Sequence, residues 1–157
     1  MNKYLKLSMI GALALSVFGT VMSQSNGVSS EEAEKLGLTK LEYDVMYNDA
    51  TERPGSSELL SEKRSGWYVD KVSGKKVFHS STKFESGTGW PSFYKPISLN
   101  ALSLEEDNSF GFTRTEVRSA DGKRHYGHVF TDGPEPTGLR YCMNGAAFDF
   151  IPDGRTK

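Results

Sequence analysis

The sequence predicts a mainly β fold. Sixteen glycines, six prolines and seven tyrosines among 157 residues favour strands joined by many turns over a bundle of helices. Two residue pairs typical of hairpin turns, Ser73-Gly74 and Asp121-Gly122, lie between segments with the composition of strands. The length predicts one domain with a hydrophobic core, because two domains of ordinary size need a longer chain.

The charge composition argues against a nucleic-acid partner. The formal net charge is −1, and the chain has no concentrated run of lysine or arginine. A nucleic-acid-binding surface normally needs clustered basic side chains, so no nucleic acid is expected to bind. Hydrophobic residues make up 36% of the chain and charged residues 25%, which is typical of a soluble globular protein.

Residues 1–23 have the pattern of a secretory signal peptide. Lys3 and Lys6 give a positive start, and the run from Leu7 to Met22 is apolar and carries no charge. An uncleaved membrane anchor is the alternative, because the run approaches the length of a short transmembrane helix. Polar residues follow at once, which favours cleavage after Ser23. The protein is therefore expected to be exported, to the periplasm or the medium, where a solitary thiol is unusual unless it is used.

Residues 24–37 are predicted to form a flexible leader and a first short helix. The leader is rich in serine, asparagine, glycine and glutamine, and Ser30 begins a segment with acidic residues in its first turn. Residues 38–157 are predicted to form the single folded domain.

A second helix is predicted from Thr39 to Tyr47. Glu42 stands three residues after Thr39, which is the spacing of a capping box. Leu41, Val45 and Met46 are expected on its buried side. Both helices are expected to be packing elements without chemistry of their own.

Strands are predicted over most of the remaining chain. Residues 67–72 and 75–79 are predicted to form a hairpin, and 108–118 and 124–130 a second one around Asp121-Gly122. Residues 84–97 contain glycine, serine and proline and are expected to form no long element, and residues 131–138 are expected to be a loop. Strands at 139–143 and 148–151 complete the prediction.

Cys142 is the only cysteine, so it cannot form an internal disulfide. If its segment is a strand, Arg140, Cys142 and Asn144 point to the same face, because side chains alternate with a period of two. A cation on that face favours the thiolate, which is the reactive form. An inert, buried cysteine is the alternative on these grounds alone.

Two histidines are expected near this thiol. If strands 124–130 and 139–144 pair across the loop with Phe130 facing Leu139, then His128 faces Tyr141 and His125 faces Asn144. Residues 125 and 128 of a regular strand point to opposite faces, so both histidines reach the site only if Gly127 forms a bulge or bend. A zinc site made of these groups is a weak case, because no pair has the spacing typical of zinc ligands.

Four motifs then occur in order, the last containing the cysteine. They are Gly87-Thr88-Gly89-Trp90-Pro91-Ser92-Phe93, His125-Tyr126-Gly127-His128-Val129-Phe130, Asp132-Gly133-Pro134 and Gly138-Leu139-Arg140-Tyr141-Cys142-Met143-Asn144. Together they resemble the methionine-R-sulfoxide reductases, the MsrB family. The upstream runs Thr51-Glu52-Arg53-Pro54 and Tyr68-Val69-Asp70 are similar too, so the resemblance covers about residues 38 to 152. The resemblance implies two antiparallel β-sheets with short N-terminal helices, and reduction of the R epimer of methionine sulfoxide in oxidised proteins.

The resemblance also implies roles for the residues named above. Cys142 would attack the sulfoxide sulfur and become a sulfenic acid. His128, with His125, would protonate the sulfoxide oxygen directly or through water. Asn144 would orient that water or oxygen, Arg140 would favour the thiolate, and Trp90 would form the apolar wall for the S-methyl group.

Three positions depart from the family pattern. Many members hold zinc with two C-x-x-C pairs, and here those positions are Asp70, Ser73, Ser119 and Gly122, so no zinc or other cofactor is expected. Thr88 stands where many members have a resolving cysteine. An external reductant, a small thiol or a thioredoxin-like protein, is therefore expected to clear the sulfenic acid. Tyr126 stands where leucine is common and is expected to reshape the pocket.

Two other functions fit part of the pattern. A Cys-His hydrolase or acyl transferase would use the same thiol, but no glycine-rich nucleophile elbow surrounds Cys142. A binding module for oxidised methionine would keep the pocket and lack turnover. The reductase, expected to be a monomer, accounts for all the motifs.

Overall fold

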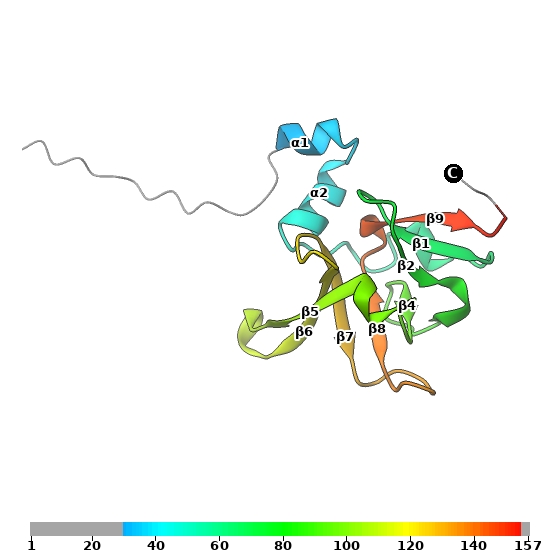
Figure 1. The fold of residues 1–157 in the computed structure, drawn as a ribbon. Coiled ribbons are helices and arrows are strands. Elements are labelled where there is room, and N and C mark those ends of the chain that lie inside the picture. The colour runs from blue at the N-terminus through cyan, green and yellow to red at the C-terminus, as the bar shows by residue number, and fades with distance from the viewer. Residues whose placement is uncertain (1–29, 155–157) are drawn as a thin grey trace, which may run out of the picture.

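The computed structural model describes residues 30–154, and Figure 1 shows their arrangement as two helices and two β-sheets. The helices are α1 (Ser30–Lys35) and α2 (Lys40–Tyr47), and the strands form one three-stranded and one six-stranded antiparallel sheet. This confirms the mainly β fold with short N-terminal helices. The predicted signal peptide and leader lie outside the described residues. Within residues 30–154, no helix has both the length and the apolar character needed to cross a bilayer.

Helix α2 begins where the sequence predicts. The Thr39 hydroxyl accepts a hydrogen bond from the Glu42 N–H, and the Glu42 carboxylate accepts one from the Thr39 N–H, so the capping box is confirmed. Val45 and Met46 are fully buried, as expected. The prediction for Leu41 is wrong, because this side chain is half-exposed on the outer side of the helix.

The three-stranded sheet has the order β2-β1-β9. Strands β1 (Gly66–Asp70) and β2 (Lys76–His79) form the predicted hairpin, with Gly74 in the left-handed conformation that its turn requires. Strand β9 (Phe148–Pro152) pairs along the other edge of β1, so the C-terminal strand closes the sheet begun by the first hairpin.

The six-stranded sheet has the order β3-β4-β8-β7-β6-β5. Its members are β3 (Lys83–Phe84), β4 (Ser92–Phe93), β5 (Leu102–Asp107), β6 (Arg114–Ser119), β7 (His125–Phe130) and β8 (Arg140–Met143). The two very short strands agree with the prediction that residues 84–97 form no long element. The hairpin around Asp121-Gly122 is confirmed, with Gly122 again in the left-handed conformation.

The predicted long strand at 108–118 is wrong in its first half. Residues 109–111 form a 3₁₀ turn, Gly111 has a φ of 80°, and β6 begins only at Arg114. A strand before it, β5, was not predicted. Its alternating Leu102 and Leu104 are followed by acidic residues, and Leu104 is half-exposed, so the apolar signal is weak.

Aromatic rings from both sheets make up much of the core. Phe78 of β2 stacks on Phe93 of β4 with ring centroids 4.4 Å apart, and Tyr68 of β1 meets the same Phe93 ring at 4.8 Å. These rings are buried. Since each such ring buries about 150–250 Å² of surface, they fix one sheet against the other.

Candidate active site

The pairing of β7 with β8 brings His128 and Cys142 directly opposite each other. The observed partners are His128 with Cys142, Val129 with Tyr141 and Phe130 with Arg140. The predicted register, with His128 facing Tyr141, is therefore wrong by one residue, and so is the pairing of His125 with Asn144. A one-residue shift moves side chains to the other face, and only the observed register puts the thiol and the imidazole on the same side.

Both histidines nevertheless reach the same side of β7. Across β6 and β7, Val117 faces Gly127 and Arg118 faces His125, so Tyr126 is an extra residue in a bulge, as the sequence predicts. The rings of His125 and His128 lie 5.4 Å apart. Gly127 has a φ of 156°, and a Cβ there would come within 2.1 Å of the Cys142 carbonyl oxygen. Only glycine fits between these strands.

A pocket of about 140 Å³ opens at this pair. Its lining consists of Thr51, Trp90, Arg114, Gly127, His128, Phe130, Cys142 and Asn144. Of the predicted site residues, the structure brings together Trp90, His128, Cys142 and Asn144. His125 and Arg140 do not line this pocket: His125 lies beside His128, and Arg140 turns toward the loop after β7. This volume suits one side chain of a substrate, and Trp90 and Phe130 give the pocket aromatic walls.

The Cys142 thiol is half-buried, and its sulfur lies 3.8 Å from the Thr88 hydroxyl oxygen. Burial raises the pKa of the Cys142 thiol, and it outweighs the opposing effects of Thr88, Arg140 and Ser92. Arg140 therefore lowers the pKa of Cys142, as expected, but this effect is smaller than that of burial. Its guanidinium donates two hydrogen bonds of 2.9 Å to the Asp132 carboxylate. Asp132 therefore competes with the Cys142 sulfur for the positive charge of Arg140.

His128 is held by a carboxylate that the sequence analysis missed. Its Nε2 lies 2.8 Å from Oδ2 of Asp107, at the end of β5, and the same oxygen accepts a bond of 2.6 Å from Arg114. Hydrogen bonds from Ser109, His128 and Arg114 keep the pKa of Asp107 well below its usual range. Burial lowers the pKa of His128, partly offset by the bond to Asp107. A neutral imidazole beside an ionised carboxylate carries its proton on Nε2, which leaves Nδ1 as the basic nitrogen.

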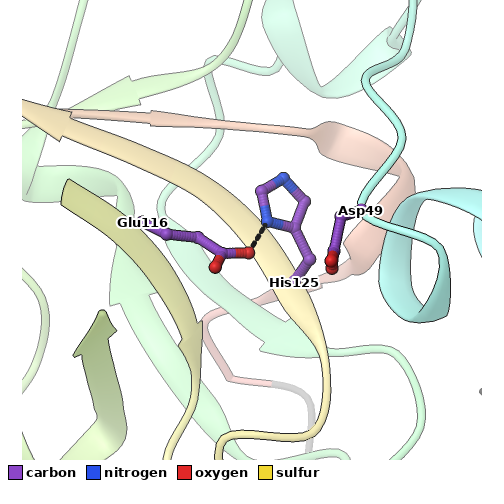
Figure 2. Close-up of side chains that lie close together, drawn as sticks. All are labelled: Asp49, Glu116 and His125. Atoms are coloured by element: carbon purple, nitrogen blue, oxygen red, sulfur yellow. Dashed lines mark hydrogen bonds and ion pairs between the residues drawn. The ribbon is translucent and has the colours of Figure 1, made fainter. Parts of the chain in front are cut away.

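His125 has a carboxylate partner of its own. Figure 2 shows its Nδ1 directed at the Glu116 carboxylate, 2.5 Å away, with Asp49 beside the ring. Its Nε2 is buried and has no hydrogen-bond partner. A polar cavity of about 450 Å³ lies here, lined among others by His125, Glu116 and Asp107, and it shares His128 with the smaller pocket.

The ligand atoms of Asp49, Glu116 and His125 lie within 4.8 Å of one another, a spacing that a metal ion could use. The Arg118 guanidinium already binds both carboxylates, at 2.9 Å to Asp49 and 2.6 Å to Glu116. Nδ1 of His125 is taken up by Glu116. Both carboxylates are thus already bound by an arginine, and the cluster carries no case for a metal.

Asn144 and Trp90 are tied to the segment before β1. The Asn144 amide accepts a bond of 3.0 Å from the Glu52 N–H and donates one of 3.1 Å to the Tyr126 carbonyl oxygen. The Trp90 indole donates to the Glu52 carbonyl oxygen at 3.1 Å. The main chain at Glu52 therefore fixes two of the predicted site residues.

Four residues at or near the site were not predicted from the sequence: Asp107, Glu116, Arg114 and Glu52. One signal was available for two of them: Arg114 and Glu116 alternate along a strand that a hairpin turn joins to the histidine strand, and Glu116 faces His128. Asp107 lies in a segment whose approach to the site depends on tertiary structure, and no local pattern marks it. Glu52 lies in the run Thr51-Glu52-Arg53-Pro54, which is part of the family resemblance, but nothing in that run predicts its contact with the site.

The four positions that the resemblance aligns with the C-x-x-C pairs of other family members form a different kind of cluster. Asp70 is fully buried and accepts bonds from Arg124 Nε at 2.9 Å and the Tyr126 hydroxyl at 2.6 Å. The Ser119 hydroxyl bonds to Asp121. One carboxylate and two serine hydroxyls, with a glycine at the fourth position, do not fit a zinc ion, which prefers thiolates and imidazoles.

The chain is similar in sequence to proteins of one known family. The SelR domain family matches residues 38–152. The chain is similar to the peptide methionine sulfoxide reductase MsrA/MsrB of Vibrio cholerae, with 52% identity over 123 residues, which are 78% of this chain and 32% of that protein. It thus spans about a third of that relative. It is also similar to the peptide methionine sulfoxide reductase MsrB of Methanosarcina mazei, with 47% identity over 86% of this chain and 96% of that protein.

Proposed function

The chain belongs to the SelR family, that of the methionine-R-sulfoxide reductases, and we propose that Cys142 and His128 carry out its reduction of methionine-R-sulfoxide. The observation that carries the proposal is the pairing of these two residues across β7 and β8 at one small pocket. The sulfoxide side chain enters this pocket with its S-methyl group against Trp90. The polypeptide that carries it stays outside, because about 140 Å³ holds a side chain only.

The thiol is protonated at rest, because burial raises its pKa. Nδ1 of His128 takes the proton from Cys142 as the sulfur attacks, and it delivers that proton to the sulfoxide oxygen. The S–O bond of the substrate breaks and an S–O bond to Cys142 forms. Methionine leaves, and the cysteine is left as a sulfenic acid that carries the oxygen and the proton.

Asp107 and His125 assist this transfer in our proposal. Asp107 fixes the tautomer of His128, as its bond to Nε2 indicates. His125 lies next to His128 with an unpartnered Nε2, which suits it to hold a water molecule between the cavity and the sulfoxide oxygen. Asn144 and Arg140 keep the roles predicted for them, orienting the oxygen and favouring the developing thiolate.

The sulfenic acid is reduced by two equivalents of an external thiol, which leave as a disulfide while water is released. Cys142 is the only cysteine of the chain, and Thr88, at 3.8 Å from its sulfur, supplies no second thiol. Either a small thiol or a thioredoxin-like protein meets this requirement. We further propose that no zinc is needed, since the Asp70 cluster joins the two hairpins in its place.

Replacement of the thiol tests the assignment. Cys142→Ser is expected to lose all turnover of a methionine-R-sulfoxide peptide with dithiothreitol, because a hydroxyl has neither the nucleophilicity nor the redox chemistry of a thiol. Turnover retained by this variant would exclude the mechanism. Elemental analysis of the pure, active protein is expected to find well below one zinc per chain, and a full equivalent would refute the zinc-free proposal.

Export and the monomeric state are also proposals. The pattern of residues 1–23 supports export, and cell fractionation of the chain with and without these residues tests it. Gel filtration with light scattering is expected to give one chain per particle.

A further inference from the structure

Glu52 contacts three parts of the site through three different groups. Its N–H donates to the Asn144 side chain at 3.0 Å, and its carbonyl oxygen accepts from the Trp90 indole at 3.1 Å. Its carboxylate accepts bonds from the N–H groups of Gly145 at 2.7 Å and Ala146 at 2.9 Å. One residue thus joins the Trp90 wall to the segment that follows Cys142.

The Glu52 carboxylate anchors a segment whose main chain has no regular pairing with the sheets. Residues 48–53 belong to no helix or strand, so no regular pairing holds this segment against the sheets. Charge-assisted bonds from two consecutive N–H groups anchor it instead. The exposed fraction of Glu52 is only 3%, so water competes little for these bonds.

The fit around the carboxylate is close. A Cβ on Gly145 would lie 1.9 Å from the Ser57 hydroxyl oxygen and 3.4 Å from Oε1 of Glu52. The carboxylate thus faces a glycine that has no room for a side chain. Glu52 does not line the pocket of Cys142, and it borders a separate cavity of about 380 Å³. It cannot hand a proton to the substrate, so its influence must pass through Trp90 and Asn144.

We propose that Glu52 is a positioning residue for methionine-sulfoxide recognition: its carboxylate anchors the main chain that holds Trp90 and Asn144 in place. This inference rests on the proposed function and adds a residue to it. Glu52 acts on substrate binding and leaves the reactivity of the thiol unchanged, because none of its contacts reaches Cys142 or His128.

The first test is a binding measurement. Glu52→Gln in a Cys142→Ser background is titrated with a methionine-R-sulfoxide peptide, so that no turnover occurs. The dissociation constant is expected to rise by about tenfold, since the loss of one well-made contact with the substrate weakens binding by about this factor. Glu58→Gln, the same change on an exposed side chain of the neighbouring segment, is the matched control and is expected to leave binding unchanged. An unchanged dissociation constant for Glu52→Gln would overturn the proposal.

A second test separates positioning from general loosening. In the chain with the native cysteine, the rate at which iodoacetamide alkylates Cys142 is expected to be the same for Glu52→Gln and the parent. A change in this rate that parallels the loss of binding would mean that the whole site is disturbed, and it would overturn the assignment. Glu52→Asp keeps the charge on a shorter side chain and is expected to give the same pattern with a smaller effect.

A third measurement does not depend on the substrate at all. Trp67→Phe leaves Trp90 as the only tryptophan, and its emission reports the surroundings of the indole. Glu52→Gln in this background is expected to shift that emission, and Glu58→Gln is not. If the parent bound no sulfoxide, the proposed function would fail while the emission shift still stood. If the emission did not move, the positioning role would be refuted.

Discussion

Two clusters of charged side chains join the hairpin of β6 and β7 to neighbouring strands, one through Asp70 of β1 and the other through Asp107 of β5, and they differ in how completely their hydrogen bonds are made. The carboxylate of Asp70 is fully buried and accepts four bonds, from Arg124, Tyr126 and the N–H groups of Val72 and Ser73. The cluster of Asp107, Glu116 and the two histidines borders a cavity and leaves one buried nitrogen, Nε2 of His125, without a partner.

This difference distinguishes a cluster that stabilises the fold from one that is suited to proton transfer or ligand binding. A carboxylate with every acceptor site occupied cannot exchange a proton or bind a ligand without losing bonds, so the Asp70 cluster serves to hold the hairpins together. An imidazole with a free nitrogen beside a cavity can exchange a proton or bind a ligand without losing a hydrogen bond. The completeness of hydrogen bonding thus predicts which variants lose stability and which lose activity.

The largest expected effect is on stability, at the closed cluster. Asp70→Ala removes the fully buried carboxylate that pairs with Nε of Arg124 and leaves Arg124 with the longer contact of 3.4 Å to Asp121, and breaking such a buried pair typically costs about 3–5 kcal/mol of unfolding free energy. Urea unfolding at pH 7 measures this loss. Asp153→Ala is the matched control, since its ion pair with His79 is exposed and is expected to cost less than about 1 kcal/mol. An equal loss in both variants would contradict the structural role of Asp70.

The Asp70 carboxylate is also expected to make the stability of the folded state depend on pH in acid. Its bonds lower the pKa of Asp70 below the unfolded value. A lowered pKa contributes stability that is complete above the unfolded pKa of about 3.9 and is lost as the pH falls through the folded pKa. Stability is therefore expected to fall below about pH 4 in the parent. Below that pH, the unfolding free energy of Asp70→Ala is expected to depend less on pH than that of the parent. An unchanged pH dependence would rule out the contribution of Asp70.

The next effect is on activity, at the open cluster. His128→Ala is expected to lower the rate of a single turnover by about a hundredfold, the usual cost of losing a positioned acid or base. Its unfolding free energy is expected to change less than that of Asp70→Ala. The control is His79→Ala, which removes the histidine of β2. Comparable rates for the two variants would remove His128 from the proton transfer.

The smallest of these effects is expected at Asp107. Asp107→Asn no longer fixes the tautomer of His128, and the rate is expected to fall by about tenfold, less than the hundredfold or more expected for losing the acid or base itself. Since the bond to Asp107 raises the pKa of His128, its loss lowers that pKa further, and the acid limb of the rate profile shifts to lower pH. Asp44→Asn, on the exposed side of α2, is the control. A shift of the acid limb to higher pH would contradict the proposed pairing.

The sequence predicts the local features of the fold well. The capping box at Thr39, the turns at Gly74 and Gly122, and the bulge at Gly127 depend on neighbouring residues, and all four occur. The β7–β8 register was predicted one residue off, because the eight-residue loop between the strands does not fix which residues pair. β5 was missed because its outward side chains are acidic and its apolar alternation is short.

The site could be predicted only in its sequence-adjacent part. Cys142, His128 and Asn144 lie within seventeen residues along the chain and resemble a family pattern. Asp107 reaches His128 from the far edge of the sheet, and Glu52 reaches Gly145 from 93 residues away. Such contacts depend on how the sheets and the segment before β1 come together, which no local pattern specifies.

We propose that the cluster of Asp107, Glu116 and the two histidines supports chemistry that passes through a sulfenic acid on Cys142. The most direct test is a single turnover without reductant, with one equivalent of a methionine-sulfoxide peptide of each epimer and dimedone to trap sulfenic acid. With the R epimer, the account predicts one reduced methionine per chain and dimedone attached to Cys142 by mass spectrometry. With the S epimer it predicts neither. Release of methionine without modification of Cys142, or equal consumption of the two epimers, would contradict it.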